Sequence, residues 1–101
     1  MSAGERVRAA RKAAGIGLRE LCVRLRARRV TLSPTMLSRW ETGAEKCPPR
    51  EEVLVAIADI CSLDAVELLC QAGRIPSDVA SAMLADPSLV RMVRERATEA
   101  R

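Results

Sequence analysis

The sequence predicts an all-α fold built around one small domain. The chain has 101 residues, 49% of them apolar, so it can bury one modest core but is too short for two. Its apolar residues are almost all aliphatic, since it contains one tryptophan and no phenylalanine or tyrosine. They recur at helical spacing, with glycine and proline mainly between the periodic segments. These observations favour helices packed by aliphatic side chains.

The first two periodic segments predict two helices joined by a short turn. The first runs from about Glu5 to Ala14, carries Arg11 on its apolar face and ends at Gly15. The second begins after Gly17, and its arginines point away from its apolar face. That apolar face consists of Leu18, Leu21, Cys22 and Leu25.

A short third helix is predicted from Pro34 to about Thr42. Proline disfavours the α conformation at the residue before it and fits the first helical position, so Ser33 is expected to be the N-cap. Gly43 is expected to end the helix. The side chains predicted on its inner face are Leu37, Trp40 and Glu41. Glu41, like Arg11, is therefore a charged residue on an apolar face.

Two more helices are expected to complete a domain of residues 1–74. Residues 50–63 form the most apolar segment, which we expect to lie at the core. Asp64 and Glu67 resemble a capping box that opens the fifth helix, and Gly73 follows that helix. The side chains predicted to point inward from it are Val66, Leu69 and Cys70.

Residues 75–101 predict a C-terminal extension of two amphipathic helices. Ser77 is expected to cap the first, and Asp86-Pro87 to begin the second. Their apolar faces need cover, so the pair either folds back onto the five-helix core or pairs with a second copy of the chain. The candidate residues for such a dimer interface are Val79, Met83, Leu89, Val90 and Val93.

No catalytic or metal-binding constellation is visible. The chain has no histidine, which removes the commonest general base, and it has no glycine-rich phosphate loop. Its four cysteines are widely spaced and form no Cys-x-x-Cys pair, so we expect reduced structural thiols, no metal and no cofactor. Binding is a better class of hypothesis than catalysis.

Charge is strongly segregated along the chain. Residues 1–50 carry twelve basic and four acidic side chains, whereas residues 51–101 carry five basic and nine acidic ones. The first half therefore suits a polyanionic partner and the second half does not. No apolar run reaches the roughly 20 residues that a membrane span needs, and the N-terminus does not read as a signal peptide. We expect a cytoplasmic protein with no membrane partner.

The letters of residues 4–73 are more specific than their spacing. GERVRAARKAAGIGLRELCVRL is followed by SPTMLSRWETGAEKCPPREEVLVAIADICSLDAVELL, a combination that resembles the Cro and phage-repressor (XRE) family of helix-turn-helix proteins. The matching positions are Arg11, Gly15, Leu18, Leu21, Cys22, Glu41, Gly43 and Pro48. The resemblance implies a five-helix Cro/repressor-like domain whose third helix enters the major groove of DNA.

The resemblance also implies roles for individual residues. Arg11 and Glu41 match a buried ion pair between the first and third helices, and Leu37 and Trp40 match positions that pack the recognition helix onto the core. The residues implied to face base edges are Pro34, Thr35 and Arg39. The residues implied or expected to lie near phosphates are Gly17, Arg19, Arg28, Arg29, Ser33, Ser38, Lys46 and Arg50.

One segment departs from the family pattern. Seven residues, RARRVTL at positions 26–32, separate Leu25 from Ser33, where the family usually has a turn about four residues shorter. Either the second helix is longer or the turn bulges, and the choice affects the register of the recognition helix.

These observations predict a dimeric transcriptional regulator, a repressor that binds a pseudo-palindromic operator in double-stranded DNA. One alternative is the antitoxin of a toxin-antitoxin pair, with the acidic second half of the chain facing a basic toxin. Another is a protein-interaction module that does not bind DNA.

Overall fold

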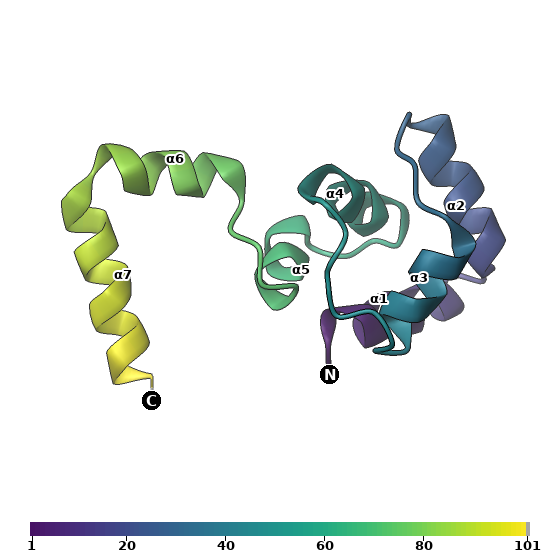
Figure 1. The fold of residues 1–101 in the computed structure, drawn as a ribbon, viewed down its shortest axis with the longest axis horizontal. Coiled ribbons are helices and arrows are strands. Elements are labelled where there is room, and N and C mark those ends of the chain that lie inside the picture. Colours follow the sequence, from purple (N-terminus) through teal and green to yellow (C-terminus); the bar gives the residue numbers. More distant parts are fainter. Residues whose placement is uncertain (101) are drawn as a thin grey trace.

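A computed structural model describes residues 1–100 of the chain, and every regular element in that range is an α-helix (Figure 1). The seven helices are α1 (Ala3–Ala13), α2 (Leu18–Ala27), α3 (Pro34–Glu41), α4 (Glu51–Ile60), α5 (Ala65–Gln71), α6 (Ser77–Ala85) and α7 (Pro87–Glu99). The predicted all-α fold is therefore confirmed. No helix in residues 1–100 is long and apolar enough to cross a membrane.

The first five helices enclose a single aliphatic core. Helix α4 packs against α2 and α5, and α3 packs against α1 and α2 (Figure 1). The largest fully buried side chains are Val7, Leu21, Leu25, Leu37, Leu54, Ile57 and Leu68. Because α3 rests on α1 and α2 on its inner side, the rest of its surface is free for a partner.

Side-chain caps explain where several helices begin. Ser33 accepts a hydrogen bond from the Met36 N–H at 3.1 Å, and Asp64 accepts one from the Glu67 N–H at 2.9 Å, as predicted. Helix α1 begins at Ala3, two residues earlier than predicted, because Ser2 caps it by accepting from the Glu5 N–H. The predicted helix boundaries are otherwise within about one or two residues.

The predicted inner face of α5 is right for Leu69 and wrong for Val66 and Cys70. Val66 and Cys70 are exposed, whereas Leu68 and Leu69 are buried. The buried stripe is therefore rotated from the expected one. Leu68 and Leu69 are adjacent in sequence and both face the core, which a template of i and i+4 positions did not capture.

The long segment between α2 and α3 was expected either to lengthen the second helix or to form a bulged turn, and it does both. Helix α2 continues to Ala27 and then closes with Arg29 in the left-handed conformation (φ 62°), where the Val30 N–H donates to the Leu25 carbonyl. The chain then runs extended to Ser33, and Val30 and Leu32 pack partly buried against the core. The additional residues are thus anchored to the domain.

The C-terminal extension stands apart from the core. Helices α6 and α7 pack against each other and contain no buried residue, and Figure 1 shows them to one side of the five-helix domain. The expected arrangement in which they fold back onto the core is not the one observed.

The junction to this extension is held by polar contacts. Ser77 was predicted to be the N-cap of α6, but Pro76 takes that position. Instead, the backbone N–H and the hydroxyl of Ser77 donate to the two carboxylate oxygens of Glu51, each at 2.8 Å. The start of α6 is therefore tied to the start of α4.

Candidate nucleic-acid interface

Helix α3 divides into an anchored face and a free face. Leu37, Trp40 and Glu41 are buried, whereas Thr35 and Arg39 are exposed. This division follows from the helical period, because residues three and four apart share a side. Thr35 and Arg39 therefore project from a helix whose other side is packed against the core.

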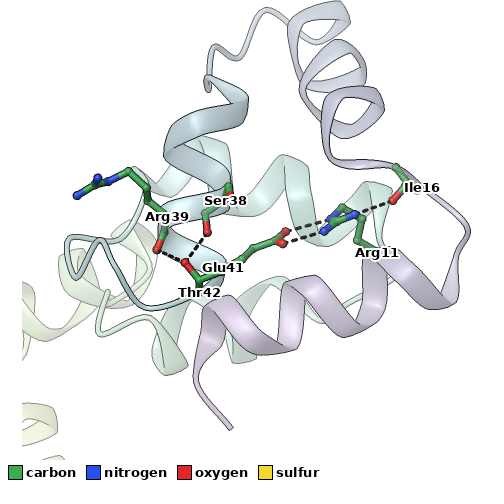
Figure 2. A network of polar contacts seen from close by, with 6 residues as sticks. All are labelled: Arg11, Ile16, Ser38, Arg39, Glu41 and Thr42. Carbon is green, nitrogen blue, oxygen red and sulfur yellow. Dashed lines mark hydrogen bonds and ion pairs between the residues drawn. The ribbon is translucent and has the colours of Figure 1, made fainter.

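An ion pair holds the end of α3 against α1 (Figure 2). Arg11 Nε donates to Glu41 Oε2 at 3.1 Å and Arg11 Nη2 donates to Glu41 Oε1 at 2.8 Å. Arg11 Nη1 donates to the Ile16 carbonyl at 3.0 Å, so the same guanidinium also fixes the turn before α2. Both side chains are more than 90% buried, and their bidentate geometry satisfies the charges that burial would otherwise penalise.

This environment changes the pKa of nearby groups. Hydrogen bonding to Glu41 raises the pKa of Arg11 further above its usual value, against an opposing effect of burial. A raised pKa means that the stabilisation is fully present below the unfolded-state value and is lost only in strongly alkaline solution. Burial also raises the pKa of the Cys22 and Cys61 thiols, which keeps them protonated and unreactive near neutral pH.

A buried glycine lets α1 approach α3 closely. A β-carbon at Gly4 would collide with the backbone carbonyl of Trp40, near the C-terminal end of α3. Glycine in a helix is otherwise unfavourable, so this close approach accounts for its position there. This role of Gly4 was not predicted, because the first helix was expected to begin only at Glu5, after the glycine.

Two candidate base-facing residues, Pro34 and Thr35, begin α3, and the third, Arg39, lies in its last turn. Thr35 and Arg39 are exposed, and Pro34, at the first helical position, is half-buried. Figure 2 shows the Arg39 side chain pointing away from the Arg11–Glu41 pair. Among residues 1–100, no carboxylate lies within 4.0 Å of the Arg39 guanidinium, so its charge is available to a ligand.

Several candidate phosphate-facing residues are exposed around α2 and α3. Gly17 is the N-cap of α2 and provides no side-chain cap, so the first backbone N–H groups of that helix are open to an anion. Ser38 is half-buried, and its carbonyl accepts a hydrogen bond from the Thr42 hydroxyl at 2.9 Å (Figure 2). The remaining exposed candidates without a carboxylate partner in residues 1–100 are Arg19, Arg29 and Lys46.

Two candidate arginines have carboxylate partners. Arg28 forms an ion pair with Asp59 of α4, which draws its guanidinium toward α4. Arg50 lies 3.5 Å from Glu52, and both side chains are largely exposed. Exposed pairs of this kind contribute little, so the Arg50 pair can exchange readily for a phosphate.

Arg74 makes two contacts that were not predicted from the sequence. Its Nε donates to the Pro49 carbonyl at 2.6 Å and its Nη2 donates to the Pro48 carbonyl at 2.9 Å. These bonds tie the residues after α5 to the linker that follows the recognition helix. No local pattern marks such a contact, since the partners are backbone carbonyls about 25 residues away.

The comparisons with known proteins agree with this geometry. A family model described as a helix-turn-helix domain matches residues 2–69, which include α1 to α4 and most of α5. The comparisons with curated proteins and with solved structures returned no match. The match covers well over half of the chain and is consistent with the resemblance to Cro and phage repressors. The chain therefore belongs to the helix-turn-helix domain family, in which α2 and α3 form the motif.

Proposed function

We propose that this protein is a dimeric transcriptional repressor that reads a pseudo-palindromic operator with α3. The observation that carries the proposal is the position of Arg39, which is exposed and lacks a carboxylate partner within residues 1–100. It projects from a helix that Leu37, Trp40 and the Arg11–Glu41 pair hold in place. A helix held rigidly in this way suits base recognition, because the entropy cost of ordering it is incurred on folding, before DNA binds.

Base recognition is assigned to the exposed face of α3. Arg39 is suited to donate two hydrogen bonds to guanine O6 and N7 in the major groove. Thr35 is suited to contact a thymine methyl group or a hydrogen-bonding base edge. Pro34 has no N–H to donate, so it contributes shape alone.

Phosphate contacts are assigned to the basic and polar groups around this helix. The open N-terminus of α2 at Gly17 offers backbone N–H groups, and Arg19 adds a charge beside them. On the other side of α3, the linker offers Lys46 and Arg50. The further proposed phosphate contacts are Arg29, Ser33 and Ser38, and also Arg28 when it leaves Asp59.

Dimerisation is assigned to the C-terminal extension. Val79 and Val93 are exposed, and Met83, Leu89 and Val90 are half-buried where α6 and α7 meet. A two-fold dimer would present two copies of α3 to half-sites about one helical turn, or ~10 bp, apart. A dimer that covers an operator excludes other proteins from it, which is the proposed means of repression.

Selection of bound duplexes from a random pool tests this function directly. We expect a two-fold symmetric consensus with half-sites spaced by about 10 bp. A consensus without symmetry would remove the dimeric operator from the proposal, and an unenriched pool would remove sequence recognition.

A salt titration separates DNA binding from a role as a protein-interaction module. The logarithm of the affinity for random duplex DNA should fall linearly with the logarithm of salt concentration, by about 0.9 per phosphate neutralised. A slope near zero would leave the protein-interaction alternative in place of DNA binding.

A further inference from the structure

The exposed side of α4 borders an apolar groove at the edge of the core. The groove has a volume of about 590 Å³ and lies between the end of α2, α4 and the start of α5. Its apolar lining consists of Val30, Val55, Ala56, Leu63 and Ala65. Val55 is 43% exposed although it lies in the middle of the most apolar helix. This α4 groove therefore has the composition of a docking surface.

The rim of the α4 groove is acidic. Glu51, Glu52 and Asp59 line it, against Arg28 as the one basic lining residue. Arg28 pairs with Asp59, and the exposed Arg50 lies near Glu52. Glu51 accepts only the neutral donors of Ser77, which leave its charge in place. An occupant of this groove should therefore be both apolar and basic.

Helix α7 has these properties. Leu89, Met92, Val93 and Arg96 follow the i, i+3, i+4, i+7 spacing of one helical face, and Met92 and Val93 are 55% and 45% exposed. Three arginines lie on the helix, and within residues 1–100 none of them has a carboxylate within 4.0 Å. These arginines are Arg91, Arg94 and Arg96, of which Arg96 alone shares the face of Met92 and Val93; the helix also carries Glu95 and Glu99.

The chain does not place its own α7 in its own groove. Ser77 is bonded to Glu51 at the groove rim, so the extension starts there. From that point α6 leads away from the domain, and Figure 1 shows α7 on the far side of α6 from α4. An extension that starts at the rim and leads outward is positioned to reach a neighbouring molecule.

We propose that α7 of a second copy of this chain docks in the α4 groove, and that two copies exchange their C-terminal helices in this way. Met92 and Val93 of one copy cover Val55 and Leu63 of the other, while Arg96 on the same face of α7 lies toward the acidic rim. Two-fold symmetry then produces two identical contacts. The inference rests on the dimer in the proposed function and names the surface that forms it.

The test compares substitutions in the groove and in the helix. Val55→Asp and Val93→Asp each place a charge on one side of the contact, and Val23→Asp is the matched control at a 60% exposed valine on α2. In light scattering, we expect a dimer for the unmodified chain and for Val23→Asp. We expect monomers for Val55→Asp and Val93→Asp, with cooperative thermal unfolding retained by all variants.

Mixing the two defective variants identifies the exchange. Val55→Asp retains an intact α7 and Val93→Asp an intact groove, so one complete contact can form between them. Dye-labelled Val55→Asp should bind Val93→Asp at least about tenfold more tightly than it binds itself. Glu52→Lys, at an exposed rim position, is a second groove variant that should weaken the dimer by about tenfold through like-charge repulsion.

Three outcomes overturn the inference. The first is a monomeric unmodified chain. The second is a Val55→Asp dimer as stable as that of Val23→Asp, which would mean that the C-terminal helices pair with each other. The third is equal affinity in mixed and unmixed variants. A salt-dependent affinity for DNA can be measured for a monomer as well as for a dimer, so failure of the docking surface is distinguishable from failure of the DNA-binding function.

Discussion

The Arg11 side chain links three parts of the molecule. It bonds Glu41 on the recognition helix and the Ile16 carbonyl in the turn before α2, while its own backbone belongs to α1. Removing one charge of a buried pair leaves the other without compensation, which is more harmful than removing both.

Arg11→Met should therefore lower the free energy of unfolding by about 3–5 kcal/mol, because it leaves the Glu41 carboxylate buried and unpaired. Arg11→Met combined with Glu41→Leu should recover most of this loss, because a well-packed apolar pair of similar volume replaces the ion pair. Urea unfolding at neutral pH measures all three chains. Losses that simply add in the double variant would show that the two residues are not coupled.

At the same scale, Arg39→Ala tests base recognition. It should leave the thermal unfolding midpoint unchanged, since the side chain is exposed and has no carboxylate partner among residues 1–100. It should relax one base position in each half-site, a loss of about 1–3 kcal/mol in discrimination. Selection from a random pool with the variant makes the comparison. A uniform loss of affinity with unchanged specificity would instead assign Arg39 to a phosphate.

Single residues also show what sequence could predict. Helical periodicity predicted Arg11 and Glu41 as charges on apolar faces, and the family resemblance implied that they pair. Gly4 and Arg74 were missed, because the reasons for their positions lie in backbone atoms of distant segments. Periodicity describes which side of a helix is buried, and it says nothing about which remote carbonyl a side chain will meet.

Among the elements, the connections after α2 and α4 each place a non-glycine residue, Arg29 and Ser62, in the left-handed region. Arg29 occupies the left-handed region at the C-terminal end of α2, where glycine is the usual residue. The same closing pattern occurs at Gly15 after α1 and at Gly73 after α5. The sequence carries no glycine at Arg29, which is why the end of α2 could not be predicted.

Arg29→Gly should stabilise the domain by up to about 1 kcal/mol, because glycine adopts this conformation without the steric cost of a β-carbon. Ala27→Gly is the matched control, since it lies inside α2 and should destabilise by about 1 kcal/mol. Thermal unfolding of both variants checks that Arg29→Gly stabilises the domain and that Ala27→Gly destabilises it. Destabilisation by Arg29→Gly would mean that its side chain makes a contact that stabilises the fold.

The helices themselves were predicted unequally. Proline and capping residues marked the starts of α3 and α5, and glycines marked the ends of α1 and α5. The predicted inner face of α5 was right only at Leu69, because a helix of seven residues is too short for its period to be read reliably. The predicted N-cap of α6 was also wrong, since the Ser77 hydroxyl donates its hydrogen bond to Glu51 of α4.

For the whole molecule, the structure gives the two predicted regions different physical characters. Residues of α1 to α5 contribute the buried core, whereas α6 and α7 contribute no buried residue. The placement of the extension could not be predicted, because an amphipathic pair satisfies its pattern equally well against its own core or against another copy.

A chain truncated after Ser77 should keep nearly all of the free energy of unfolding and lose the dimer. It retains the core, the Arg74 contacts to the linker and the Ser77 bonds to Glu51. Light scattering and urea unfolding of the truncated and full chains check the two expectations together. A truncated chain that is still dimeric would place the interface within residues 1–77.

The burial of Trp40 makes the protein its own optical probe. It is the only aromatic residue in the chain, so all of the near-ultraviolet fluorescence comes from one indole at the base of the recognition helix. The indole is 7% exposed and belongs to the buried core, whereas the neighbouring Arg39 is exposed, so the indole should report a shift of that helix from its buried side. Movement of α3 on binding or unfolding can therefore be followed in the unmodified molecule, with no added label and no second emitter to subtract.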